Sequence, residues 1–251
     1  MKISETAKKN FSELFPDQNL ALSKTDPDFI EINRNFTFDE VLQYVNLDSK
    51  IATEVILSSL IAMNVMTEYK SILGSALHIG IPPIEIKELL YHSVPYVGFA
   101  RALDALLTTN TIFKEKNIIM SPESQSTTTT ETRFEKGLEV QKTIFGEGVI
   151  KALDESPENQ KHLRIFLADN CFGDHYTRKG IDLKTRELLT FSMLVSLGGC
   201  ESQVKAHVQG NLNVGNDKLT LISVITQLLP YIGYPRTLNA LNCINEVTPE
   251  N

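Results

Sequence analysis

The 251-residue chain has no tryptophan, only three cysteines and no long apolar run. No stretch approaches the roughly 20 consecutive apolar residues that cross a bilayer, and the charged N-terminus lacks the apolar segment of a signal peptide. We therefore expect a cytoplasmic protein with no membrane partner. The cysteines have neither CxxC spacing nor histidines at zinc-site intervals, so we expect reduced thiols and no metal.

Positive charge is also scarce, because 24 Lys and Arg residues stand against 31 Asp and Glu residues and give a formal net charge of -7. Nucleic-acid binding depends on clustered Lys and Arg, and no such cluster occurs. Nucleic acid is thus excluded as the expected partner. The 42% hydrophobic content supports one large domain or two of ordinary size.

One pattern occurs twice. Residues 94–107 read VPYVGFARALDALL, and residues 229–242, at an offset of 135, read LPYIGYPRTLNALN; seven of the twelve positions that start at Pro95 and Pro230 are identical. Such a duplication predicts two tandem domains, which we place at 1–120 and 133–251. The Ser- and Thr-rich segment 121–132, SPESQSTTTTET, is typical of a flexible linker.

Both halves have helical apolar spacing. EVILSSLIAM at 54–63 and ELLTFSMLVSL at 187–197 each form a nearly continuous apolar face without the alternation of a strand. Asp182 is a candidate N-cap for the second of these helices, and Gly198 with Gly199 is expected to end it. Asn216 or Asp217 is expected to cap the next helix. The sequence therefore predicts an all-α protein.

The second half carries several features in a fixed order: GDHYTRKG at 173–180, TREL at 185–188, His207 followed eight residues later by Gly215, and GYP at 233–235. In this order they resemble the carboxymuconolactone decarboxylase family. The first half, from about residue 27, resembles the same family more weakly, as in tandem members. The resemblance implies a helical carboxymuconolactone decarboxylase or AhpD-like fold that assembles around a threefold axis, here as a homo-oligomeric trimer of tandem chains.

The family's chemistry suggests which residues act. Its members perform either cofactor-free decarboxylation of a lactone acid or, in the alkylhydroperoxidase-D-like branch, peroxide reduction. The resemblance implies Glu187, Cys200 and His207 as catalytic residues, with His207 donating a proton and Glu187 fixing its tautomer. Arg178 and Arg186 are the implied ligands for the carboxylates of a small substrate.

Alternatives stay open for each of these residues. The peroxidase branch has a second cysteine where this chain has Gln203, but Cys200 at a helix N-terminus is expected to have a lowered thiol pKa. Cys200 could instead fill space, and the two arginines could form structural salt bridges. A non-catalytic binding or scaffold protein is the third possible function.

The first half lacks the implied histidine. Its position equivalent to His207 is Ile72, so we expect that copy to have lost the site, with Glu54 as a remnant of Glu187. His78 and His92 are not at the family's histidine position and are expected to be surface residues or hydrogen-bonded core residues. His162 and His175 lack metal-ligand spacing.

Overall fold

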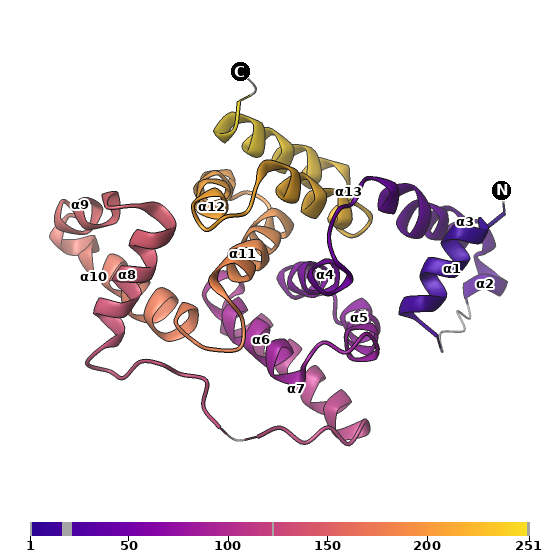
Figure 1. Ribbon diagram of the computed structural model, residues 1–251, viewed down its shortest axis with the longest axis horizontal. Helices are drawn as coiled ribbons and strands as arrows, with labels where there is room; N and C mark the ends of the chain where they lie inside the picture. The colour runs from indigo at the N-terminus through magenta and orange to yellow at the C-terminus, as the bar shows by residue number, and fades with distance from the viewer. Residues whose placement is uncertain (1, 17–21, 122, 250–251) are drawn as a thin grey trace.

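The computed structural model describes residues 2–16, 22–121 and 123–249, and within these ranges it contains helices and no strand (Figure 1). The first half comprises α1 (Glu5–Leu14), α2 (Leu22–Thr25), α3 (Pro27–Asn35), the π-helical turn η1 (Phe36–Glu40), the 3₁₀ turn η2 (Val41–Tyr44), α4 (Ser49–Met63), α5 (Met66–His78), α6 (Pro83–Val97) and α7 (Phe99–Glu115). The second half comprises α8 (Arg133–Phe145), α9 (Gly148–Asp154), α10 (Glu158–Phe166), the π-helix η3 (Leu167–Tyr176), α11 (Leu183–Leu197), α12 (Glu201–Asn213) and α13 (Lys218–Val247). The all-α prediction is confirmed.

The predicted helix ends are also found. The Asp182 side chain accepts a hydrogen bond from the Thr185 backbone N–H at 2.9 Å and so caps α11. Gly198, with φ of 70°, ends that helix in a conformation that favours glycine. Of the two candidate caps for α13, Asp217 is the one used, because its side chain accepts from the Thr220 N–H at 2.7 Å.

The two halves contain helices of matching length and order. α4 and α11 each have 15 residues, and α5 and α12 each have 13. Gly98 separates α6 from α7, and Gly233, which also has a positive φ, kinks α13 at the equivalent point. Asp48 caps α4, and Asp182 caps α11. When the two helices are aligned at these caps, Thr53 corresponds to Glu187, and Glu54, the expected remnant, does not.

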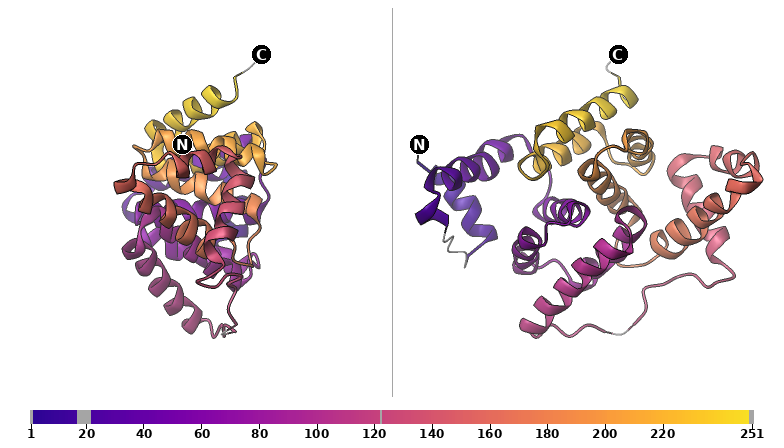
Figure 2. Two further views of the ribbon diagram at one scale, coloured as in Figure 1. Left: turned by 90° about the vertical axis from the view of Figure 1, so that its left-hand side faces the viewer. Right: turned by 180° about the vertical axis from the view of Figure 1, so that it is seen from behind.

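The halves share one apolar core. α4 and α11 lie side by side at the centre, with α1–α3 at one end of the molecule and α8–α10 at the other (Figures 1 and 2). A hydrogen bond of 2.7 Å between the buried hydroxyls of Ser196 and Ser59 joins the two central helices. The fully buried side chains of these helices include Val55, Leu57, Ile61, Leu189, Phe191 and Met193. Each such side chain contributes about 1.5 to 3 kcal/mol to folding, and side chains of both halves belong to the same core. The division into domains 1–120 and 133–251 stays a prediction.

The segment between the halves has no regular helix, as its composition indicates. It runs along one edge of the molecule between α7 and α8 (Figure 1). The Thr127 and Thr128 hydroxyls donate to the backbone carbonyls of Thr177 and Gly173 at 2.9 and 3.1 Å. These contacts attach the segment to the end of η3. Among the described helices, none is both long and apolar enough to span a membrane.

Candidate functional site

Glu187 and His207 meet in the interior of the second half. Glu187 on α11 is fully buried, and its Oε2 lies 2.8 Å from Nδ1 of His207 on α12. Asn211 ties the two helices together, since its side-chain amide donates to the backbone carbonyls of both Glu187 and His207 at 3.1 and 2.7 Å. Gly210 permits the close approach: a Cβ there would lie 2.7 Å from the Glu187 Oε2 atom.

Two tyrosines extend this pair into a chain of hydrogen bonds. The Tyr176 hydroxyl, at the end of η3, donates to Glu187 Oε1 at 2.7 Å, and the Tyr96 hydroxyl lies 2.7 Å from that of Tyr176. Burial raises the pKa of both hydroxyls well above the usual value, and the negative charge of Glu187 raises it further, so both stay protonated. Tyr96 belongs to α6, and the site therefore draws on both halves of the chain.

His92 lies at the other end of this series of hydrogen bonds. Its Nε2 lies 3.2 Å from the Arg186 carbonyl and 2.9 Å from Thr190 Oγ1. Since a carbonyl only accepts, Nε2 carries the ring proton. Burial lowers the His92 pKa well below its usual value, and the nearby Arg186 charge adds to this, so the ring is neutral. Its complete burial makes His92 a core residue, one of the two expected placements, but its Nδ1 atom has no hydrogen-bond partner among the described residues.

Along this series of hydrogen bonds, the donors all point toward Glu187. Thr190 Oγ1 accepts from the histidine and lies 2.8 Å from the Tyr176 hydroxyl, whose single proton is given to Glu187. Both carboxylate oxygens then act as acceptors, one for Tyr176 and one for His207. His207 accordingly carries its proton on Nδ1, and Nε2 is the nitrogen left for chemistry.

A mostly apolar pocket of about 530 Å³ adjoins His207. The rings of Tyr96 and Phe145 pack edge-on against the imidazole, with centroids 5.9 and 5.2 Å away. The pocket wall is formed by Pro95, Tyr96, Phe145, Leu167, Cys171, Phe172, Leu194, Leu197, Gly198, Cys200, Gln203 and His207. A small molecule in this space would lie against the imidazole.

Cys200 lines the same pocket but is not joined to the Glu187–His207 pair. It is the N-cap of α12, and its thiol donates to the Leu194 carbonyl at 3.1 Å. The predicted lowering of its pKa is wrong: burial raises the pKa, and the nearby Glu201 carboxylate raises it further.

Cys171 is a second pocket thiol, outside the predicted set of site residues. It lies on η3, and burial raises its pKa to about 12. Its sulfur lies 3.9 Å from the Tyr96 hydroxyl, a long contact for a weak donor. Both pocket cysteines are therefore thiols near neutral pH.

The two predicted substrate-binding arginines do not line the pocket. Arg178 donates from Nε and Nη2 to the two carboxylate oxygens of Glu88 at 2.8 and 2.9 Å. Arg186 is fully buried, donates to the Arg178 carbonyl at 2.9 Å, and places Nη2 3.5 Å from Glu88 Oε2. Because Glu88 lies on α6, this cluster connects the halves, which is the geometry of the structural salt-bridge alternative.

Arg236 is a cation at the border of the pocket that the candidate set missed. A Cβ at Gly198 would lie 3.4 Å from the Nε atom of Arg236. Arg236 also lines a small adjoining cavity together with Cys200 and Leu194. The repeated sequence pattern contained the signal, because Arg236 matches Arg101 there. Among the described residues, no three His, Cys, Asp or Glu side chains are grouped to hold a metal ion.

The fold and the site define an all-helical protein with a buried carboxylate–imidazole pair beside an apolar pocket. The model of the carboxymuconolactone decarboxylase family matches residues 163–246, the region that carries all five predicted site residues. A 4-carboxymuconolactone decarboxylase from Acinetobacter baylyi is 29% identical over 118 residues, which are 47% of this chain and 87% of that protein. The second half of the chain is thus similar to the carboxymuconolactone decarboxylase family.

Proposed function

We propose that the chain is an enzyme that performs cofactor-free acid–base chemistry on a small carboxylated substrate, as a decarboxylase of the carboxymuconolactone type. The observation that supports this most is the buried pair of Glu187 and His207, with 2.8 Å between Oε2 and Nδ1, at the wall of a pocket. The relative from Acinetobacter baylyi, by its name, decarboxylates 4-carboxymuconolactone. This makes the same lactone the first substrate to test.

The proposed reaction separates the roles of substrate and protein. The carbon–carbon bond to the carboxylate breaks, carbon dioxide leaves, and the electron pair moves into the neighbouring carbonyl system as a dienolate. A doubly protonated His207 then donates its Nε2 proton to the carbanionic carbon, and water restores that proton. The Glu187 carboxylate stabilises the positive charge of the ring during this cycle and fixes its orientation.

The hydrogen-bonded tyrosines act as positioning residues in this scheme. Tyr176 holds Glu187 Oε1 at 2.7 Å, so the carboxylate can turn only its other oxygen toward His207. Arg236, at the pocket border beside Gly198, is the cation that we assign to a carboxylate of the substrate in place of Arg178 and Arg186.

Thiol-dependent peroxide reduction is the second candidate, because Cys171 and Cys200 line one pocket. There, a thiolate would attack the peroxide O–O bond and become a sulfenic acid as water or an alcohol leaves. The other thiol would then form a disulfide with release of water, and an external thiol would supply the two electrons that restore both. The raised pKa of both sulfurs disfavours this route relative to acid–base chemistry.

The two functions are separated by one pair of assays. Purified protein is incubated with 4-carboxymuconolactone while carbon dioxide release is followed, and separately with hydroperoxide and dithiothreitol while peroxide loss is followed. We expect turnover in the first assay only. Peroxide consumption alone would replace the proposal by its second candidate, and inertness in both assays would favour a binding or scaffold protein.

A further inference from the structure

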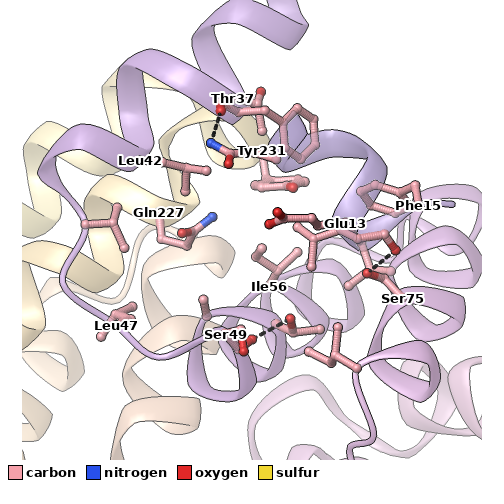
Figure 3. A pocket seen from close by; sticks show the side chains of 18 residues that line it. Glu13, Phe15, Thr37, Leu42, Leu47, Ser49, Ile56, Ser75, Gln227 and Tyr231 are labelled. Carbon is pink, nitrogen blue, oxygen red and sulfur yellow. Dashed lines mark hydrogen bonds between the residues drawn. The ribbon is translucent and has the colours of Figure 1, made fainter. Parts of the chain in front are cut away.

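The first half contains a cavity of about 440 Å³ between α1, η1, α4, α5 and α13 (Figure 3). It lies where the helix correspondence places a counterpart of the His207 pocket. Thr53 on α4 stands in the place of Glu187, and Ile72 on α5 stands in the place of His207. The cavity therefore keeps its walls but has no acid–base pair.

In both pockets, the other half of the chain contributes residues to the wall. Tyr96 from the first half lines the His207 pocket, and Tyr231, which lies 135 residues later on α13, lines this cavity. Gln227, which corresponds to His92 by the same offset, adds an amide to the wall. The second half thus supplies the first half's cavity with its amide and its phenol ring.

The Gln227 amide is the polar group with unused hydrogen-bonding capacity. Its side chain is only 4% exposed, and its Oε1 atom has no hydrogen-bond partner among the described residues. Figure 3 shows the amide nitrogen directed toward the middle of the cavity, where the Glu13 carboxylate approaches from α1. A buried amide oxygen without a partner is costly, so this arrangement favours a ligand that supplies one.

Two hydroxyls of the wall are already engaged. Thr53 donates to the Ser49 carbonyl at 2.7 Å, and Ser75 donates to the Leu14 carbonyl at 2.8 Å (Figure 3). Gln227 and Glu13 are the amide and the carboxylate that Figure 3 shows at the middle of the cavity, and they are the partners that we assign to a ligand. A hydroxyl group pairs with both, since it accepts from an amide N–H and donates to a carboxylate. With the amide flipped, the hydroxyl instead donates its one proton to the unpaired Gln227 Oε1.

Charge and shape restrict the rest of the ligand. Of the described residues that line the cavity, none is Lys, Arg or His, and Glu13 is the charged one. Glu13 is largely exposed, and Lys9, which is not part of the wall, lies 3.9 Å from its Oε1. A carboxylated ligand would meet a like charge and no cation among the lining residues, which disfavours the kind of substrate proposed for the other pocket. The apolar side chains of Phe15, Phe38 and Ile56 enclose the remaining space, and the volume falls in the range of about 300 to 1,000 Å³ common to small-molecule sites.

We propose that this cavity binds a small neutral molecule with an apolar, ring-sized body and one hydroxyl group, such as a phenol. The hydroxyl lies between Gln227 and Glu13, and the apolar body lies against Phe38 and Ile56. This binding site is separate from the His207 pocket and does not depend on the reaction that takes place there.

Three probes of nearly equal shape test the ligand class: p-cresol, toluene and p-toluate. Each is titrated into the full chain carrying ¹³C-labelled isoleucine and leucine methyl groups, and dissociation constants are read from the methyl shifts. We expect p-cresol to bind about tenfold more tightly than toluene, the usual effect of well-formed hydrogen bonds, and p-toluate to bind most weakly. Nuclear Overhauser contacts from the p-cresol methyl should reach Ile56 and Ile72.

Two matched variants test the assigned amide. Gln227→Leu should weaken p-cresol binding about tenfold while leaving toluene binding within about twofold. Gln203→Leu, which changes the wall of the other pocket, should leave all three constants unchanged. If Gln227→Leu does not fold, the proposal is still tested by the affinity ranking of the three probes and by the position of the Overhauser contacts in the unaltered chain.

Three results would overturn the proposal. The first is the absence of p-cresol binding at millimolar concentration, and the second is equal p-cresol affinity in the Gln227→Leu variant. The third is a set of contacts to Leu194 and Leu197, which would move the ligand to the His207 pocket.

Discussion

Gly210→Ala is a test of the close packing that brings Glu187 to His207. In an open helix this substitution stabilises by about 0.5 to 1 kcal/mol, because alanine is the better helix former. Here the new Cβ would lie 2.7 Å from both Glu187 Oε2 and Ile144 Cγ2. Overpacking of this kind typically costs about 1 to 3 kcal/mol, so we expect a net destabilisation of about 0 to 2 kcal/mol together with displacement of the carboxylate.

The expected functional loss is larger than the loss of stability. A shift of the carboxylate by a few tenths of an ångström breaks the hydrogen bond that orients the imidazole, so turnover should fall about 10-fold to 100-fold. Gly74→Ala on α5 is the matched control, since nothing lies within 4 Å of its added Cβ. Urea denaturation and carbon dioxide release are measured for both variants. Full activity of Gly210→Ala with a raised stability would refute the packing argument.

Burial raises the pKa of Glu54 to about 8 from 4.5. Because this carboxyl ionises first in the unfolded chain, the free energy of unfolding should fall as pH rises from about 5 to 8, by an amount on the order of a few kcal/mol that Glu54→Gln should remove. Equal pH dependence of the urea midpoints in both proteins would contradict this. Cys200, with its raised pKa, should react slowly with hydroperoxide at neutral pH; rapid trapping of a sulfenic acid, lost in Cys200→Ser, would reverse that conclusion. Light scattering should give a mass about three times the 28.1 kDa of the chain, as the proposed trimer requires, whereas a monomer at micromolar concentration is incompatible with it.

Much of the local structure could be predicted from the sequence, because it depends on neighbours along the chain. The apolar spacing of 187–197 predicts a helix, and Asp182 and Gly198 define its ends, as α11 shows. The pairing of Glu187 with His207 could be anticipated only through the family resemblance, since helical spacing gives no distance between side chains on two different helices.

The residues that were missed depend on contacts between the halves. Tyr96 reaches the site from α6, about 80 residues before Tyr176, and no local pattern reports that packing. Arg178 has the charge of a carboxylate ligand, but its partner, Glu88, lies 90 residues away. The burial of the Cys200 sulfur, which depends on packing that a sequence does not report, sets the direction of its pKa shift.

Substitution of His207 tests the central claim most directly. With 4-carboxymuconolactone as substrate, His207→Asn should reduce the rate of carbon dioxide release by about 10² to 10⁴, the usual contribution of a general acid or base. His162→Asn, the same change at an exposed histidine of the same half, serves as control and should leave the rate unchanged. Circular dichroism should show equal helicity in both variants. Undiminished carbon dioxide release by a folded His207→Asn variant would contradict the assignment of His207 as the proton-transfer group.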